Sequence, residues 1–117
     1  MPIRLFHNPR CSKSRAALAL LRQRGVEPEV VEYLKQPPSA AEIDRLLTLL
    51  GMQPRQLMRR GEAPYRELGL DDPGLSRAAL IAAMAENPIL IERPIAVRGE
   101  RAVLGRPPEK VLELLDG

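Results

Sequence analysis

The first third of the chain has two short apolar runs on either side of a segment with helical spacing. Residues 3–7 (IRLFH) form an apolar run that ends at the loop residues NPR, which predicts a strand. Residues 12–24 place Ala17, Leu18 and Leu21 at helical spacing and stop at Gly25. The run EVVEY, residues 29–33, predicts a second strand. Together these segments predict a βαβ unit with parallel strands and a right-handed crossover.

The middle of the chain is predicted to be helical. Ser39 and Glu42 have the spacing of a capping box, and an apolar face follows them, made of Ile43, Leu46, Leu47 and Leu50. We therefore expect a helix from about Ala40 to Leu50. The segments QPRQLMRR (53–60) and APYREL (63–68) predict short helical pieces, and Ser76 is expected to cap a helix that runs to about Glu86.

The last part of the chain predicts a hairpin and a helix. Residues 95–104 (IAVRGERAVL) contain two β-prone runs around Gly99 and Glu100. The segment PPEKVLELL (107–115) predicts a helix with one apolar face, made of Val111, Leu112 and Leu115. The order is βαβ, a helical insertion at about 39–87, and ββα. It predicts an α/β protein with the thioredoxin-like fold, in which residues 1–117 form a single domain around a small mixed sheet.

Composition narrows the functional classes. Apolar residues make up 44% of the chain and charged residues 28%, which is typical of a soluble globular protein. No segment approaches the roughly 20 apolar residues that cross a bilayer, and the N-terminus lacks a signal-peptide pattern, so we expect a cytoplasmic protein without membrane contact. The net charge is only +3 and aromatic residues make up 3%, with basic residues scattered along the chain. Nucleic acid is therefore not an expected partner.

Cys11 is the only cysteine, and it lies where the first strand gives way to the first helix. A helix N-terminus stabilises a thiolate and a nearby anion, so the position favours nucleophilic chemistry on an oxyanion. The segment CSKS lacks the second thiol of a dithiol motif, and one cysteine with one histidine does not predict a metal site. Any redox cycle at Cys11 must take its second thiol from another molecule.

Four segments of the chain resemble one known family. HNPRCSKSR (7–15), LMRRGEAPYRELGL (57–70), NPILIERPIAV (87–97) and GRPPEKVLELL (105–115) are similar, in this order, to the motifs of the glutaredoxin-linked arsenate reductases. The resemblance implies reduction of arsenate to arsenite through a thiol-arsenate adduct. It also implies glutathione as co-substrate, glutaredoxin as partner, and no bound cofactor.

The resemblance assigns roles to individual residues. It makes Cys11 the nucleophile and gives His7 a part in keeping the Cys11 thiol ionised. The arginines that hold the oxyanion fall on Arg59, Arg93 and Arg106. Arg60 is adjacent to Arg59, and the family pattern counted back from PYRELGL favours Arg59. Three further residues are implied as supports: Ser14 and Arg15 for the thiolate and its loop, and Pro94, whose bond to Arg93 is expected to be cis.

Two alternatives remain at this stage. The Spx-type regulators share this fold and loop position but bind RNA polymerase and reduce no substrate. The three arginines favour the enzyme, and those regulators often keep a second cysteine that this chain lacks. The other alternative is a related glutathione-dependent thiol reductase that does not use arsenate.

Overall fold

The computed structural model describes residues 2–115, which divide into two compact units. The sheet unit combines residues 2–36 with residues 93–115, and the helical unit is Pro37–Glu92. The helical unit covers the expected insertion and extends it by a few residues at each end. The expectation that the whole chain forms a single domain stays a prediction.

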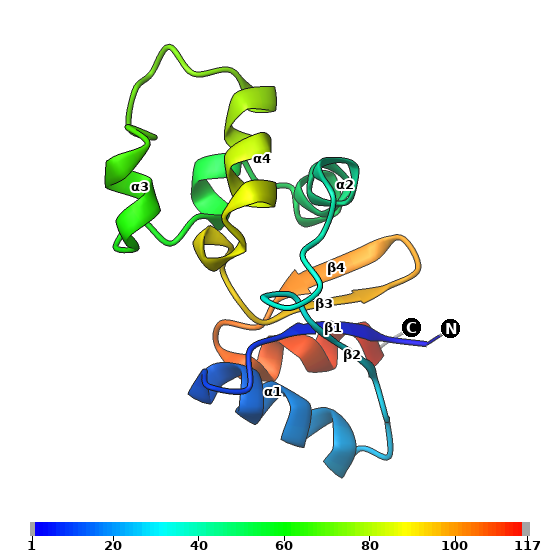
Figure 1. Ribbon diagram of the computed structural model, residues 1–117. Helices are drawn as coiled ribbons and strands as arrows, with labels where there is room; N and C mark the ends of the chain where they lie inside the picture. The colour runs from blue at the N-terminus through cyan, green and yellow to red at the C-terminus, as the bar shows by residue number, and fades with distance from the viewer. Residues whose placement is uncertain (1, 116–117) are drawn as a thin grey trace. The chain divides into compact units, whose positions relative to one another are not determined.

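The sheet unit contains a four-stranded mixed sheet in the order β2-β1-β3-β4 (Figure 1). The central strand β1 pairs in parallel with β2 and antiparallel with β3, and β3 pairs antiparallel with β4. The predicted βαβ unit, the hairpin and the mixed sheet are confirmed. The strands are β1 (Arg4–His7), β2 (Glu29–Glu32), β3 (Ile95–Arg98) and β4 (Arg101–Leu104).

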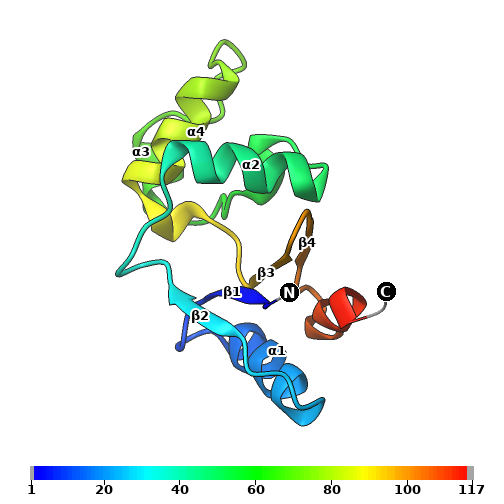
Figure 2. The same cartoon turned by 90° about the vertical axis from the view of Figure 1, so that its right-hand side faces the viewer.

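Helices cover one face of this sheet (Figures 1 and 2). Helix α1 (Ser12–Gln23) connects β1 to β2 and packs beside the C-terminal helix η3 (Pro108–Leu115). Gly25 ends the α1 segment with φ of 76°, a conformation that glycine adopts without steric cost. The core of this face consists of Ile3, Leu5, Ala17, Leu21, Ala96, Val111 and Leu114.

The C-terminal helix differs from the expectation in its buried face. Val111 and Leu114 are fully buried, whereas Leu112 and Leu115 are partly exposed, although Leu115 still packs against the core. The prediction that Leu112 shares the buried face was wrong. The segment is a 3₁₀ helix with three residues per turn, so residues 111 and 114 fall on the same side.

The helical unit contains two longer helices that pack together, α2 (Ala40–Leu50) and α4 (Arg77–Glu86). Both begin as predicted, because the Ser39 and Ser76 hydroxyls accept hydrogen bonds from the backbone N–H of Glu42 and Ala79, at 3.1 Å each. The shorter pieces are η1 (Pro54–Leu57), α3 (Ala63–Glu67) and η2 (Pro88–Leu90). Buried aliphatic side chains of these elements include Ile43, Leu46, Leu47, Leu57, Leu80, Met84 and Leu90.

None of the helices between residues 2 and 115 combines the length and apolar character that a membrane-spanning helix requires.

Candidate active site

Cys11 occupies the N-cap of α1, directly after the loop that follows β1. Its backbone is extended, with φ of −93° and ψ of 124°, and its carbonyl accepts the first helical hydrogen bond, from the N–H of Arg15 at 3.0 Å. The N–H of Cys11 donates to the Asn8 carbonyl at 3.0 Å, which closes a tight turn between the two residues. The thiol is partly exposed, so a small substrate can reach it.

The surroundings of Cys11 favour its thiolate form. Burial by itself raises the pKa of the thiol, but hydrogen bonds outweigh burial and lower this pKa to about 7. The donors are the backbone N–H groups of Ser14 and Lys13, the Ser14 hydroxyl and the Arg93 side chain. At neutral pH a large share of the molecules therefore carries a nucleophilic thiolate at this position.

Ser14 and Arg15 hold the loop in front of the thiol. The Ser14 side chain is fully buried, and its hydroxyl accepts a hydrogen bond from the N–H of Asn8 at 3.4 Å. The Arg15 guanidinium donates from Nη1 to the Pro9 carbonyl at 3.0 Å. Both residues thus join the first turn of α1 to the preceding loop, which fixes the orientation of Cys11.

Arg93 reaches the thiol from a distant part of the sequence. Because β3 runs antiparallel to β1 with Ile95 opposite Phe6, the residues just before β3 lie beside the loop that follows β1. The expected cis bond between Arg93 and Pro94 is present. Arg93 donates a hydrogen bond to Cys11, while its Nε and Nη1 atoms are buried without a hydrogen-bond partner among residues 2–115.

Arg106 is placed beside Arg93 by the segment after β4. Its Nε donates to the Arg93 carbonyl at 2.9 Å, and the N–H of Gly105 donates to the Pro94 carbonyl at 2.8 Å. A side chain at position 105 would begin only 2.7 Å from the Pro94 ring, so glycine permits this close approach. A second cis bond, between Arg106 and Pro107, was not predicted from the sequence.

His7 is buried at the end of β1, with 5% of its surface exposed. Burial lowers the pKa of His7, and the positive charges of Arg22 and Arg15 lower it further against the opposing effect of Glu32. The imidazole is therefore uncharged at neutral pH, and its Nδ1 has no hydrogen-bond partner in the described part of the chain. The expected contribution of His7 to the ionisation of Cys11 stays a prediction.

Arg59 belongs to the helical unit and is paired with two carboxylates. Its Nη1 lies 3.0 Å from a Glu92 oxygen and its Nε 3.4 Å from a Glu62 oxygen. Partial burial lowers the pKa of Arg59, but the hydrogen bonds to Glu92 and Glu62 outweigh burial and raise it. The N–H of Arg59 donates to the Leu90 carbonyl at 2.7 Å, which holds the Arg59 backbone against the segment that leads to Glu92.

Sequence reasoning missed both carboxylate partners of Arg59. Glu62 follows Arg59 at a spacing of three residues, which was a usable local signal. Glu92 is separated from Arg59 by 33 positions and is brought to it by a bridge between Met58 and Ile91. That contact depends on the tertiary structure of the helical unit.

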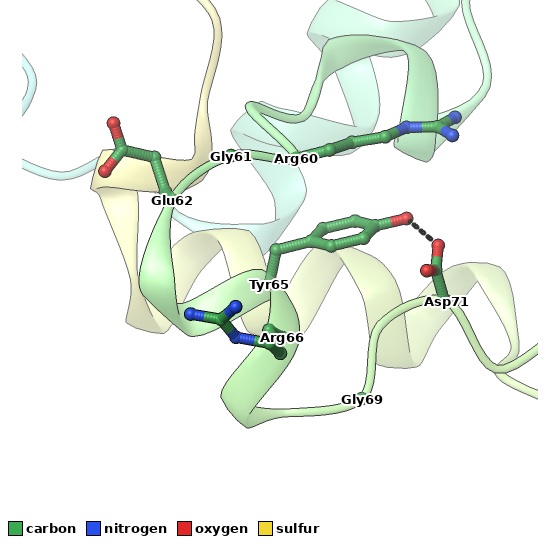
Figure 3. Close-up of a pocket in the computed structure, with 7 residues that line it drawn as sticks. All are labelled: Arg60, Gly61, Glu62, Tyr65, Arg66, Gly69 and Asp71. Atoms are coloured by element: carbon green, nitrogen blue, oxygen red, sulfur yellow. Dashed lines mark hydrogen bonds between the residues drawn. The ribbon is translucent and has the colours of Figure 1, made fainter.

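Arg60, the neighbour considered for the same role, has a different environment. It is exposed and lines a cavity of about 460 Å³ within the helical unit (Figure 3). In this cavity the Tyr65 hydroxyl donates to Asp71 at 2.6 Å, and the guanidinium groups of Arg60 and Arg66 point away from each other. The arginines of this cavity do not converge on a common point, and the choice of Arg59 as oxyanion ligand stays a prediction.

Between residues 2 and 115 there is no group of three or more His, Cys, Asp or Glu side chains that could hold a metal ion.

Comparison with known proteins identifies the family of the chain. Residues 6–114 match the model of the ArsC family. An arsenate reductase of Neisseria meningitidis serogroup A is 48% identical over 97% of both chains, and an uncharacterised Escherichia coli protein, YfgD, is 55% identical over 97% of this chain and 96% of its own. The solved structure of an arsenate reductase from Vibrio cholerae superposes with a TM-score of 0.93 at 53% identity, over 97% of both chains. The thioredoxin-like fold is thereby confirmed, and the chain belongs to the ArsC family.

Proposed function

We propose that this chain reduces arsenate to arsenite, with Cys11 as the nucleophile and external thiols as the electron donors. The observation that carries the proposal is Arg93, which donates one hydrogen bond to the Cys11 thiol and has two more guanidinium nitrogens, Nε and Nη1, buried without a partner among residues 2–115. Buried donors are nearly always paired in proteins, so this arrangement favours an oxygen-rich anion beside the thiol.

The chemistry follows from the charges at Cys11. Arsenate is a tetrahedral oxyanion, and a thiolate attacks it only when its negative charge is neutralised. Arg93 and Arg106 provide fixed guanidinium donors, and the start of α1 provides backbone N–H groups. Cys11 then forms a sulfur–arsenic bond while the bond from arsenic to one hydroxyl oxygen breaks. That hydroxyl takes up a proton from solvent, equal to the one that the thiol gave up, and leaves as water, and arsenic stays pentavalent in this adduct.

The reduction itself needs two electrons, which a single cysteine does not supply. We propose that glutathione attacks the adduct and that a glutaredoxin thiol completes the cycle and regenerates Cys11. In the overall balance two thiols become one disulfide, arsenic passes from the pentavalent to the trivalent state, and arsenite and water are released. The arsenate reductase relatives and the match to the ArsC family support this substrate.

Arg59 is proposed as a third oxyanion ligand on the strength of the family resemblance. Its two carboxylate partners, Glu62 and Glu92, offset the positive charge of Arg59 and so weaken its attraction for an anion. His7, Ser14, Arg15 and Pro94 keep their proposed supporting roles.

A coupled assay tests the proposed reaction. Purified protein is mixed with arsenate, glutathione, glutaredoxin, glutathione reductase and NADPH, and NADPH oxidation is followed. We expect oxidation that depends on arsenate and disappears in the Cys11→Ser variant. An absence of signal at millimolar arsenate would contradict the proposal, and so would full activity of the Cys11→Ser variant.

Arginine variants separate oxyanion ligands from surface cations. We expect Arg93→Ala and Arg106→Ala to lower kcat/KM for arsenate by roughly 100- to 1,000-fold, because fixed donors to a reacting oxyanion contribute about 3–4 kcal/mol. Arg22→Ala and Arg77→Ala are the controls, since these exposed arginines pair with Glu27 and Asp44. Equal losses in all four variants would show that the effect is not specific to the site.

The regulator alternative makes the opposite prediction. A chain of that type would show no arsenate-dependent oxidation and would co-purify with RNA polymerase. A reductase that uses glutathione without arsenate would oxidise NADPH only with another substrate.

A further inference from the structure

Another cavity, in the sheet unit, lies directly beside the Cys11 loop. It measures about 220 Å³ and is lined by residues 7–10 together with Glu32, Leu34 and Lys35 at the end of β2. We call it the His7 pocket. The wall of the pocket is joined to the nucleophile by a hydrogen bond. The N–H of Cys11 donates to the carbonyl of Asn8, one of the lining residues, at 3.0 Å. A molecule bound in the pocket is therefore separated from Cys11 only by the tight turn of residues 8–11.

His7, one of the residues that line this pocket, has an unsatisfied polar atom. The side chain is 95% buried, and its Nδ1 is buried without a hydrogen-bond partner within residues 2–115. Such atoms are rare in folded proteins because an unpaired buried polar group costs free energy. A neutral imidazole nitrogen pairs either with an ammonium or with a carboxyl group, according to its tautomer.

Charges of both signs surround the pocket. Arg10 and Lys35 are exposed cations, and Glu32 is a half-buried anion whose carboxylate lies 3.5 Å from the Lys35 ammonium. Leu34 adds an apolar side chain that is 40% exposed. A pocket with two cations, one anion and an apolar wall matches a zwitterion with a short aliphatic chain better than it matches a simple anion.

We propose that the His7 pocket binds the γ-glutamyl end of glutathione, the thiol co-substrate of the proposed function, on which this inference rests. The α-carboxylate of the γ-glutamyl group pairs with Arg10 and Lys35, and its ammonium pairs with Glu32 and donates to the unpaired Nδ1 of His7. The methylene groups lie on Leu34. The cysteinyl thiol extends along residues 8–10 toward Cys11, and the glycyl end makes no required contact.

Binding to the intact protein tests this assignment without any turnover. The ¹⁵N-labelled Cys11→Ser chain is titrated with three compounds that carry a methylated sulfur: glutathione, γ-glutamylcysteine and cysteinylglycine. We expect the first two to bind with similar affinity and to shift the amide signals of residues 7–10 and 32–35. Cysteinylglycine, which lacks the γ-glutamyl group, is expected to bind at least roughly fivefold more weakly, the equivalent of one lost charge pair of about 1 kcal/mol. Equal binding of all three compounds, shifts confined to other residues, or no binding would overturn the proposal.

Kinetics with matched variants distinguish the pocket from the oxyanion site. We expect Arg10→Gln and Lys35→Gln each to raise the KM for glutathione roughly fivefold and to leave the KM for arsenate within about twofold. Arg24→Gln and Lys110→Gln are the matched controls, because both residues are exposed in the same unit and do not line the pocket.

An unchanged KM for glutathione in the Arg10 and Lys35 variants of an active enzyme would refute the pocket while leaving arsenate reduction intact. Binding of the γ-glutamyl compounds by a chain that does not reduce arsenate would refute the proposed function while leaving the pocket intact.

Discussion

At the scale of single residues, the Cys11 thiol is stabilised by hydrogen bonds from neighbours in the sequence and from one distant residue. The position of a lone cysteine between a strand and a helix was readable from the sequence, and so was the helix start that stabilises its thiolate. The hydrogen bonds from Ser14 and Lys13 are local consequences of that helix start. The bond from Arg93 is not local, since 82 positions separate the two residues, and it arises only because β3 pairs with β1.

The depressed pKa of Cys11 gives a prediction about its reactivity. Iodoacetamide reacts with the thiolate, so the alkylation rate should rise with pH through a midpoint near 7 and then level off, because the folded-state pKa lies at about 7. In the Arg93→Met variant one donor to the thiolate is lost, and the midpoint should move upward by roughly one unit. The measurement is the alkylation rate from pH 5 to 10, followed by mass spectrometry.

The control for this prediction is Arg77→Met, which removes an exposed cation that is paired with Asp44. Its midpoint should stay near that of the wild type. A wild-type midpoint at about 8.5, the ordinary value for a cysteine, would show that the loop does not activate the thiol.

At the scale of elements, local patterns predicted most of the boundaries. The helix α2 begins at Ala40 and ends at Leu50 as expected, because the Ser39 cap and the apolar spacing both act over a few residues. The C-terminal segment was the exception. The predicted apolar face grouped Leu112 with Val111, but Leu114 is the buried residue. Positions 111 and 114 lie on the same side in an α-helix as well as in a 3₁₀ helix, so the apolar pattern of the segment did not by itself decide which leucine contacts the core.

The buried face of η3 can be tested by truncating its leucines. Leu114→Ala should lower the free energy of unfolding by about 2–5 kcal/mol, because it removes a fully buried side chain from the core of the sheet unit. Leu112→Ala should cost clearly less, since Leu112 is partly exposed. Urea denaturation followed by circular dichroism measures both values. A larger loss for Leu112 than for Leu114 would restore the buried face that the sequence predicted.

At the scale of the whole molecule, the chain forms two strands of the sheet, then the helical unit, and then the two remaining strands. The sheet unit is built from residues 2–36 and 93–115, and the 56 residues of Pro37–Glu92 form the helical unit between them. Units of about 60 residues or fewer bury a comparatively small share of their surface and are marginally stable alone. We therefore expect the two units to unfold together, as the single-domain prediction requires.

The two tyrosines of the chain make this expectation measurable. Tyr33 lies in the sheet unit and Tyr65 in the helical unit, and both are buried. In the absence of tryptophan, the Tyr65→Phe variant reports on the sheet unit through Tyr33 fluorescence, and Tyr33→Phe reports on the helical unit through Tyr65. Within each variant, the urea midpoint from the remaining tyrosine should coincide with the midpoint from circular dichroism. Separate transitions in either variant would mean that the units are independent domains.

The sequence by itself determined what depends on neighbours along the chain. This includes the order of strands and helices, the serine caps, the glycine turns and the position of Cys11 at a helix start, because each follows from steric and hydrogen-bonding preferences over a few residues. The family resemblance added the candidate arginines and the cis bond before Pro94. The tertiary structure decided what depends on residues far apart: the hydrogen bond of Arg93 to Cys11, the bond of Arg106 to the Arg93 carbonyl, and the pairing of Arg59 with Glu92. These contacts require strand pairing and chain reversal, since only a packed fold brings distant charges within hydrogen-bonding range.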